Sequence, residues 1–77
     1  HQYDNERSIM ETKTYSIPNI HCMHCVNRIQ QAIQAIEGVD FAEADMASLS
    51  LTVDFEAPAD DQTIRQTLEA IGYPAAA

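Results

Sequence analysis

The sequence predicts an α+β sandwich with two helices on one face of a small antiparallel sheet. Apolar and polar residues alternate in three segments, which indicates half-buried strands. In two other segments the apolar residues recur every three or four positions, which indicates amphipathic helices. The order is strand, helix, strand, strand, helix, and the few residues that follow leave the last strand short or missing. The plan is therefore a ferredoxin-like βαββαβ sandwich.

The first strand and helix lie in the first half of the chain. Alternation runs from Thr12 to Ile20, and the regular strand should stop near Pro18, which cannot donate a hydrogen bond to a sheet. Helical spacing begins at Cys25, and Gly38 is placed to end that helix. The expected buried stripe of the helix is Val26, Ile29, Ile33 and Ile36.

Two strands and a second helix follow. A strand from Val39 and a strand over Leu49–Glu56 are expected to meet at a turn at Ala47-Ser48. Asp60 or Asp61 can cap the second helix, and Gly72 ends it. The residues expected in the core from these segments and from the first strand are Tyr15, Ala42, Ala44, Met46, Leu49, Leu51, Val53, Phe55, Ile64, Leu68 and Ile71. The carboxylates Glu43, Asp45, Asp54 and Glu56 are expected on solvated strand faces.

Length and charge limit the function classes. The chain has 77 residues and a formal net charge of −8, so we expect one small acidic domain. This charge disfavours nucleic acid and anionic membranes as partners, since both require a basic face. We interpret residues 1–10 as a flexible lead-in. They lack the apolar region of a secretory signal, and no run of about 20 apolar residues predicts membrane insertion, so we expect a cytoplasmic location.

The only two cysteines, Cys22 and Cys25, form a C-x-x-C pair. Such a pair indicates a redox dithiol, half of a zinc site or a two-thiolate site for a soft metal. The pair lies where a loop enters a helix, and the unpaired amides and dipole of a helix start stabilise thiolates. Two partly exposed thiolates suit Cu(I), whereas structural Zn(II) normally requires four protein ligands. We therefore expect a Cu(I) site.

The run N-I-H-C-M-H-C-V-N-R-I resembles the metal-binding loop of heavy-metal-associated domains, the fold of copper chaperones, of N-terminal domains of copper-transporting P-type ATPases and of mercury-binding proteins. Gly38-Val39 and the segment from Ile64 to Tyr73 extend the resemblance, which covers about residues 12–75. It implies a domain over residues 11–77 that binds metal through Cys22 and Cys25. It also implies that Tyr73 shields the thiolates and that Ile20 packs under the loop in place of the family's usual methionine.

Two histidines depart from the family's pattern. His21 replaces the common threonine or serine, and His24 lies inside the spacer. One interpretation is that both are solvent-exposed polar residues. The alternative is that one is an extra ligand, which would extend the site toward Zn(II), Ni(II) or Hg(II), or that their titration tunes metal release. Met23 is expected to point outward, and Arg28 either favours the thiolates or is an ordinary exposed residue.

The resemblance implies a metallochaperone, or a metal-binding domain of a transporter, that transfers Cu(I) by thiolate exchange. Its partner would be a copper-transporting P-type ATPase or another protein with a C-x-x-C site. We expect a monomer without metal, with a metal-bridged dimer as the alternative. No catalytic Ser/His/Asp set or glycine-rich phosphate loop is present, so we expect no enzymatic activity, and a dithiol oxidoreductase is a distant alternative.

Overall fold

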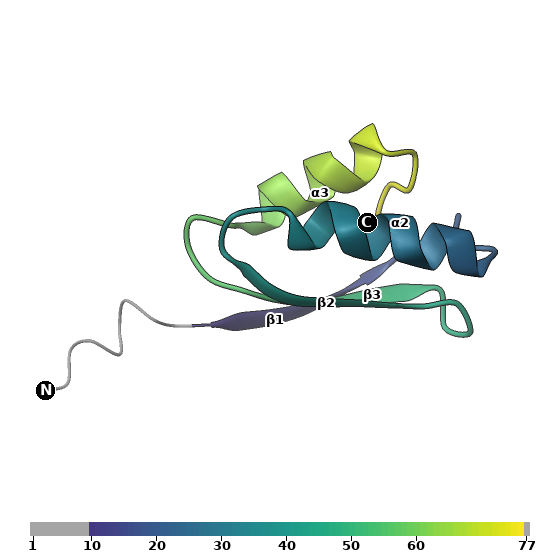
Figure 1. Cartoon of the computed structure of the whole chain (residues 1–77), viewed down its shortest axis with the longest axis horizontal. Coiled ribbons are helices and arrows are strands. Elements are labelled where there is room, and N and C mark those ends of the chain that lie inside the picture. The colour runs from purple at the N-terminus through teal and green to yellow at the C-terminus, as the bar shows by residue number, and fades with distance from the viewer. Residues whose placement is uncertain (1–9, 77) are drawn as a thin grey trace, which may run out of the picture.

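The computed structural model describes residues 10–76 and contains five elements (Figure 1). In chain order these are β1 (Glu11–Ser16), α2 (Met23–Gln34), β2 (Val39–Asp45), β3 (Ser50–Phe55) and α3 (Asp61–Ala70). The order confirms the predicted plan. Residues 1–9 of the expected lead-in lie outside the described part, and Met10 is exposed.

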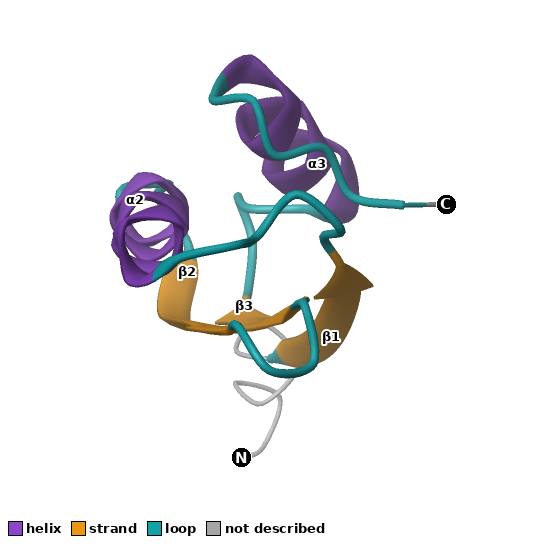
Figure 2. Ribbon diagram, turned by 90° about the vertical axis from the view of Figure 1, so that its right-hand side faces the viewer, coloured by secondary structure: helices purple, strands orange, loops and turns teal. Residues whose placement is uncertain are grey.

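The three strands form one antiparallel sheet in the order β1-β3-β2. Both helices lie on the same side of this sheet, as Figure 2 shows, and no helix or strand of residues 10–76 covers the opposite face. Alternation places Leu51, Val53 and Phe55 under the helices, each at most 2% exposed, while Thr52 and Asp54 are only partly buried. The core therefore lies between the sheet and the two helices.

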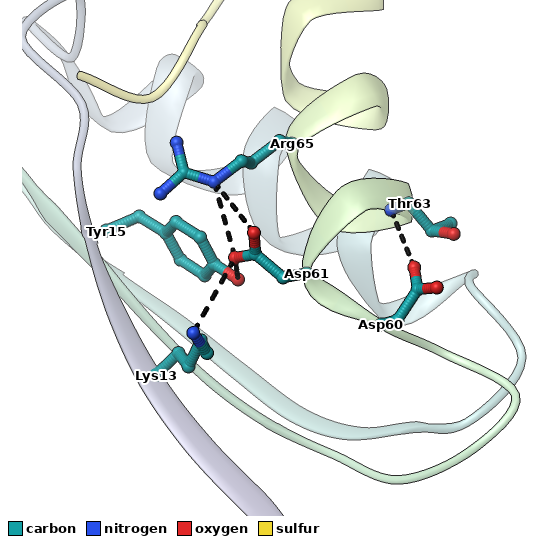
Figure 3. Close-up of polar contacts among 6 residues, drawn as sticks. All are labelled: Lys13, Tyr15, Asp60, Asp61, Thr63 and Arg65. Carbon is teal, nitrogen blue, oxygen red and sulfur yellow. Dashed lines mark hydrogen bonds and ion pairs between the residues drawn. The ribbon is translucent and has the colours of Figure 1, made fainter. Parts of the chain in front are cut away.

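Each helix contributes the expected stripe to this core. The buried residues are Cys25, Val26, Ile29 and Ile33 in α2, and Ile64 and Leu68 in α3. The Asp60 side chain caps α3 by accepting a hydrogen bond of 2.8 Å from the Thr63 amide, as predicted (Figure 3). Helix α2 ends at Gln34, ahead of Ile36, which packs against the core from the following loop.

A polar cluster ties β1 to α3 (Figure 3). The Tyr15 hydroxyl donates a hydrogen bond of 2.8 Å to Asp61, and the Arg65 guanidinium lies 5.3 Å from the centre of the Tyr15 ring. Arg65 and Lys13 also approach the Asp61 carboxylate, at 3.1 and 4.0 Å. The Tyr15 ring itself is 3% exposed, which confirms its expected place in the core. The cluster therefore fixes one end of α3 over the sheet.

The connection between β2 and β3 differs from the prediction. It spans residues 46–49 instead of a turn at Ala47-Ser48 alone, and it removes Met46 and Leu49 from the core, at 39% and 37% exposure. Leu49 adopts a left-handed conformation with φ of 54°, and its carbonyl accepts a hydrogen bond of 2.7 Å from the Ile17 amide. That bond helps hold a conformation that leucine rarely adopts. Because of this conformation, the alternation of buried and exposed residues in β3 does not extend to Leu49.

The edge of the sheet beside β1 carries no fourth strand within residues 10–76. A single backbone hydrogen bond of 2.7 Å, from the Ala76 amide to the Ser16 carbonyl, lies where that strand would pair. The expectation of a short or missing last strand is confirmed. Among the same residues, neither helix has the length and apolar content needed to cross a bilayer.

Candidate metal site

The cysteines lie at the junction of β1 and α2, after a loop that is held in place by two buried isoleucines. Strand β1 stops at Ser16, and Ile17 and Ile20, at 0% and 2% exposure, continue into the core from the loop. Ile20 thus belongs to the hydrophobic core, as does Cys25. The Asn19 side chain donates a hydrogen bond of 3.2 Å to the Gly72 carbonyl, which ties this loop to the one after α3. Sequence reasoning missed that tie, since no local pattern relates residues 53 positions apart.

Cys22 occupies the N-cap of α2 in an extended conformation, and Cys25 lies in the first turn. The Cys22 side chain does not cap the helix, although its carbonyl accepts hydrogen bonds from the amides of Cys25 and Val26. The sulfur is therefore not committed to a backbone amide. No acidic residue lies in the first turn, so the positive end of the helix dipole is left for the sulfurs.

The two sulfurs lie 3.2 Å apart and are not bonded as a disulfide. The expectation that both are partly exposed is wrong for Cys25, which is 2% exposed, whereas Cys22 is half-buried. The reason is helical geometry: Cys25 lies one turn before Ile29 on the stripe that faces the core. The site therefore has one accessible sulfur and one covered sulfur.

Tyr73 covers Cys25 from the loop after α3. The chain turns at Gly72, where φ is 91°, and the Tyr73 amide donates to the Leu68 carbonyl at 2.9 Å. This places the Tyr73 hydroxyl 3.1 Å from the Cys25 sulfur, to which it donates a hydrogen bond. Tyr73 therefore contacts the cysteine pair directly through this hydrogen bond.

This hydrogen bond changes the acidity of the pair. The Tyr73 hydroxyl, followed by the backbone of His21, stabilises the Cys25 thiolate and lowers its pKa to about 7, although burial acts in the opposite direction. The same bond raises the pKa of Tyr73. Since the thiolate is the nucleophilic and metal-binding form of cysteine, the lowered pKa raises the fraction of Cys25 in that form at neutral pH.

The two histidines have different places. His21 is exposed, but its ring nitrogens lie 4.0 Å from the Cys25 sulfur, and His21, Cys22 and Cys25 each offer a donor atom within 4.8 Å of the other two. His24 is exposed on α2 and does not belong to this cluster. Met23, at 58% exposure, and the exposed Arg28 also lie outside it.

The donor set fits a soft metal ion. Two thiolates bound at about 2.3 Å lie about 3.8 Å apart at a tetrahedral angle and about 4.6 Å apart in a linear arrangement. The sulfurs would therefore separate by roughly 0.6–1.4 Å on binding, a change that side-chain rotation of the half-buried Cys22 can supply.

A hollow of about 280 Å³ lies elsewhere, along α3. It is lined in part by Arg65 and Pro74 and includes neither cysteine.

Comparisons with known proteins give consistent results. A family model described as the heavy-metal-associated domain matches residues 14–74. Apo-CopP from Helicobacter pylori is 33% identical, with a TM-score of 0.78 over 86% of this chain and 100% of that chain. Oxidized MerP from Ralstonia metallidurans CH34 is 26% identical, with a TM-score of 0.83 over 88% and 96% of the two chains.

A third similar structure is the N-terminal domain of a potential copper-translocating P-type ATPase from Bacillus subtilis in its Cu(I)-loaded state. It is 26% identical, with a TM-score of 0.81 over 87% of this chain and 85% of that chain. A comparison with curated proteins gave no match.

Proposed function

Since the chain belongs to the heavy-metal-associated domain family, we propose that it binds Cu(I) through Cys22 and Cys25 and passes the ion to a partner protein. The observation that carries this proposal is the pair of free sulfurs 3.2 Å apart at the start of α2. A site of two soft donors favours Cu(I), which accepts low coordination numbers, over ions that need four protein ligands.

The unequal exposure of the two sulfurs supports an ordered transfer. A thiolate of the partner reaches the ion on the side of the half-buried Cys22 and forms a three-coordinate intermediate. Cys22 then leaves, and a second partner thiolate displaces Cys25. The copper stays Cu(I) throughout, because only ligands are exchanged. The Tyr73 hydroxyl, 3.1 Å from the Cys25 sulfur, stabilises that thiolate as it is released.

The net charge of −8 favours a partner with a basic docking surface, which would steer the encounter in a salt-dependent way. Such a partner would be a copper-transporting P-type ATPase or another protein with a C-x-x-C site, and the similar Bacillus subtilis domain supports this choice. We propose a non-catalytic role in the cytoplasm, as a free chaperone or as one domain of a transporter. The metal-free form would be monomeric.

The proposal is tested by Cu(I) titration of the reduced protein in competition with a chelator of known affinity. We expect one Cu(I) per chain, and we expect the double variant Cys22→Ser, Cys25→Ser to lose at least about a thousandfold in affinity, or about 4 kcal/mol. His24→Ala is the control, since His24 lies outside the donor cluster. Unchanged Cu(I) affinity in the double serine variant would refute the proposal.

A further inference from the structure

His21 lies in the loop before the cysteines and has no role in the proposed two-sulfur Cu(I) site. It immediately precedes Cys22, and both nitrogens of its exposed ring lie 4.0 Å from the Cys25 sulfur. Within the described part of the chain, it is the one nitrogen donor in a cluster whose donor atoms all lie within 4.8 Å of one another. Its position therefore brings a borderline nitrogen donor to a pair of soft sulfurs.

A hydrogen bond to the loop backbone fixes which nitrogen is available. The Nδ1 atom of His21 lies 2.8 Å from the Asn19 carbonyl oxygen. A carbonyl oxygen only accepts hydrogen bonds, so Nδ1 carries the proton and donates it. In the neutral ring the lone pair is then on Nε2. Histidines that bind metals in proteins almost always donate their other ring N–H to such an acceptor, which orients the ring and raises its basicity.

The distances are close to those of two ligands on one ion. A thiolate at about 2.3 Å and an imidazole nitrogen at about 2.0 Å from a shared ion lie about 3.5–3.7 Å apart at tetrahedral or trigonal angles. Nε2 and the Cys25 sulfur are 4.0 Å apart. Because the sulfur is equally distant from both nitrogens, the exposed ring must turn for Nε2 to face the ion, and the Nδ1 hydrogen bond to Asn19 must adjust with it.

We propose that His21 is a third metal ligand, through Nε2, and that it extends the cargo of this site to borderline divalent ions, Zn(II) foremost. The inference rests on the proposed function, because Cys22 and Cys25 supply the other two ligands. Two thiolates balance the charge of a divalent ion, and a fourth position stays open for water or for a partner's ligand. Open sites with three protein ligands suit Zn(II) that is to be exchanged. Cu(I) needs only the sulfurs.

His21→Ala and His24→Ala form a matched pair, since both residues are exposed histidines beside the cysteines in sequence and only His21 belongs to the cluster. Each reduced variant is titrated with Zn(II) against a chromophoric chelator. We expect His21→Ala to weaken Zn(II) binding by about tenfold or more, and His24→Ala to change it by less than about twofold. Equal effects of the two substitutions would overturn the assignment.

X-ray absorption at the zinc edge of the unmodified protein tests the same assignment without a substitution. We expect two sulfur scatterers and one imidazole nitrogen per zinc, besides any oxygen of a bound water, and we expect His21→Ala to lose the imidazole signal. A zinc shell without imidazole would overturn the inference. Zn(II) bound through two sulfurs and His21 in a protein that fails to bind Cu(I) would instead refute the proposed Cu(I) function and leave this inference intact.

Discussion

At the scale of single residues, the acidity of the Cys25 thiol depends most on one hydroxyl group. The Tyr73 hydroxyl donates a hydrogen bond to the Cys25 sulfur at 3.1 Å and is the largest cause of its lowered pKa. A hydrogen bond to a thiolate stabilises the charged form, and the effect is stronger where water is excluded. Tyr73 therefore favours the thiolate form of Cys25 at neutral pH.

The substitution Tyr73→Phe keeps the ring and removes this hydrogen bond. We expect the pKa of the more acidic thiol of the pair to rise from about 7 toward the ordinary cysteine value of about 8.5. The thiolate fraction at neutral pH then falls, so the pH profile of alkylation by iodoacetamide shifts to higher pH. Ultraviolet absorbance of the thiolate against pH gives the same quantity directly.

Tyr15→Phe is the matched control for that titration. It removes a tyrosine hydroxyl that bonds Asp61, on the side of the molecule where β1 meets α3. We expect its thiol titration to coincide with that of the unmodified protein. A Tyr73→Phe protein whose thiols titrate as in the unmodified protein would contradict the role given to Tyr73.

At the scale of elements, the geometry of the site depends on how helices and loops end. The loop after α2 must reverse at Gly38, and the loop after α3 must reverse at Gly72 to bring Tyr73 to the cysteines. Both glycines have positive φ, 102° and 91°. They differ in space: a Cβ at Gly38 would lie 2.7 Å from the Ala59 amide nitrogen, whereas a Cβ at Gly72 would meet nothing within 4 Å.

Alanine substitutions at these two glycines separate the cost of backbone strain alone from the cost of strain combined with a steric clash. Gly72→Ala should cost about 1–2 kcal/mol of unfolding free energy, because alanine disfavours the left-handed conformation. Gly38→Ala adds a clash with backbone atoms and should cost more, about 3 kcal/mol or above. Urea denaturation followed by circular dichroism measures both. Equal losses in the two variants would contradict the close approach at Gly38.

At the scale of the whole molecule, the sequence predicted the element order, the helical stripes and the inward face of β3, because periodic burial leaves a periodic pattern. It failed at the turn between β2 and β3. There Leu49 is held in a left-handed conformation by a hydrogen bond from Ile17, a contact between distant residues that no local pattern records.

The candidate site likewise has features that the sequence predicted and features that only the structure shows. The C-x-x-C spacing and the resemblance identified the two cysteines, and the resemblance suggested Tyr73. The burial of Cys25 was not predicted, although its spacing of one turn before Ile29 places it on the predicted buried stripe of the helix. The distinction between His21 and His24 also needed the three-dimensional arrangement, because only the structure places the His21 ring beside the Cys25 sulfur.

We propose above that the two cysteine sulfurs together bind Cu(I). The decisive measurement is X-ray absorption at the copper edge of the protein loaded with one Cu(I) per chain. We expect the edge of Cu(I) with two sulfur neighbours per copper, and the loss of that sulfur shell in the Cys22→Ser, Cys25→Ser variant. A copper shell of nitrogen and oxygen without sulfur would contradict it.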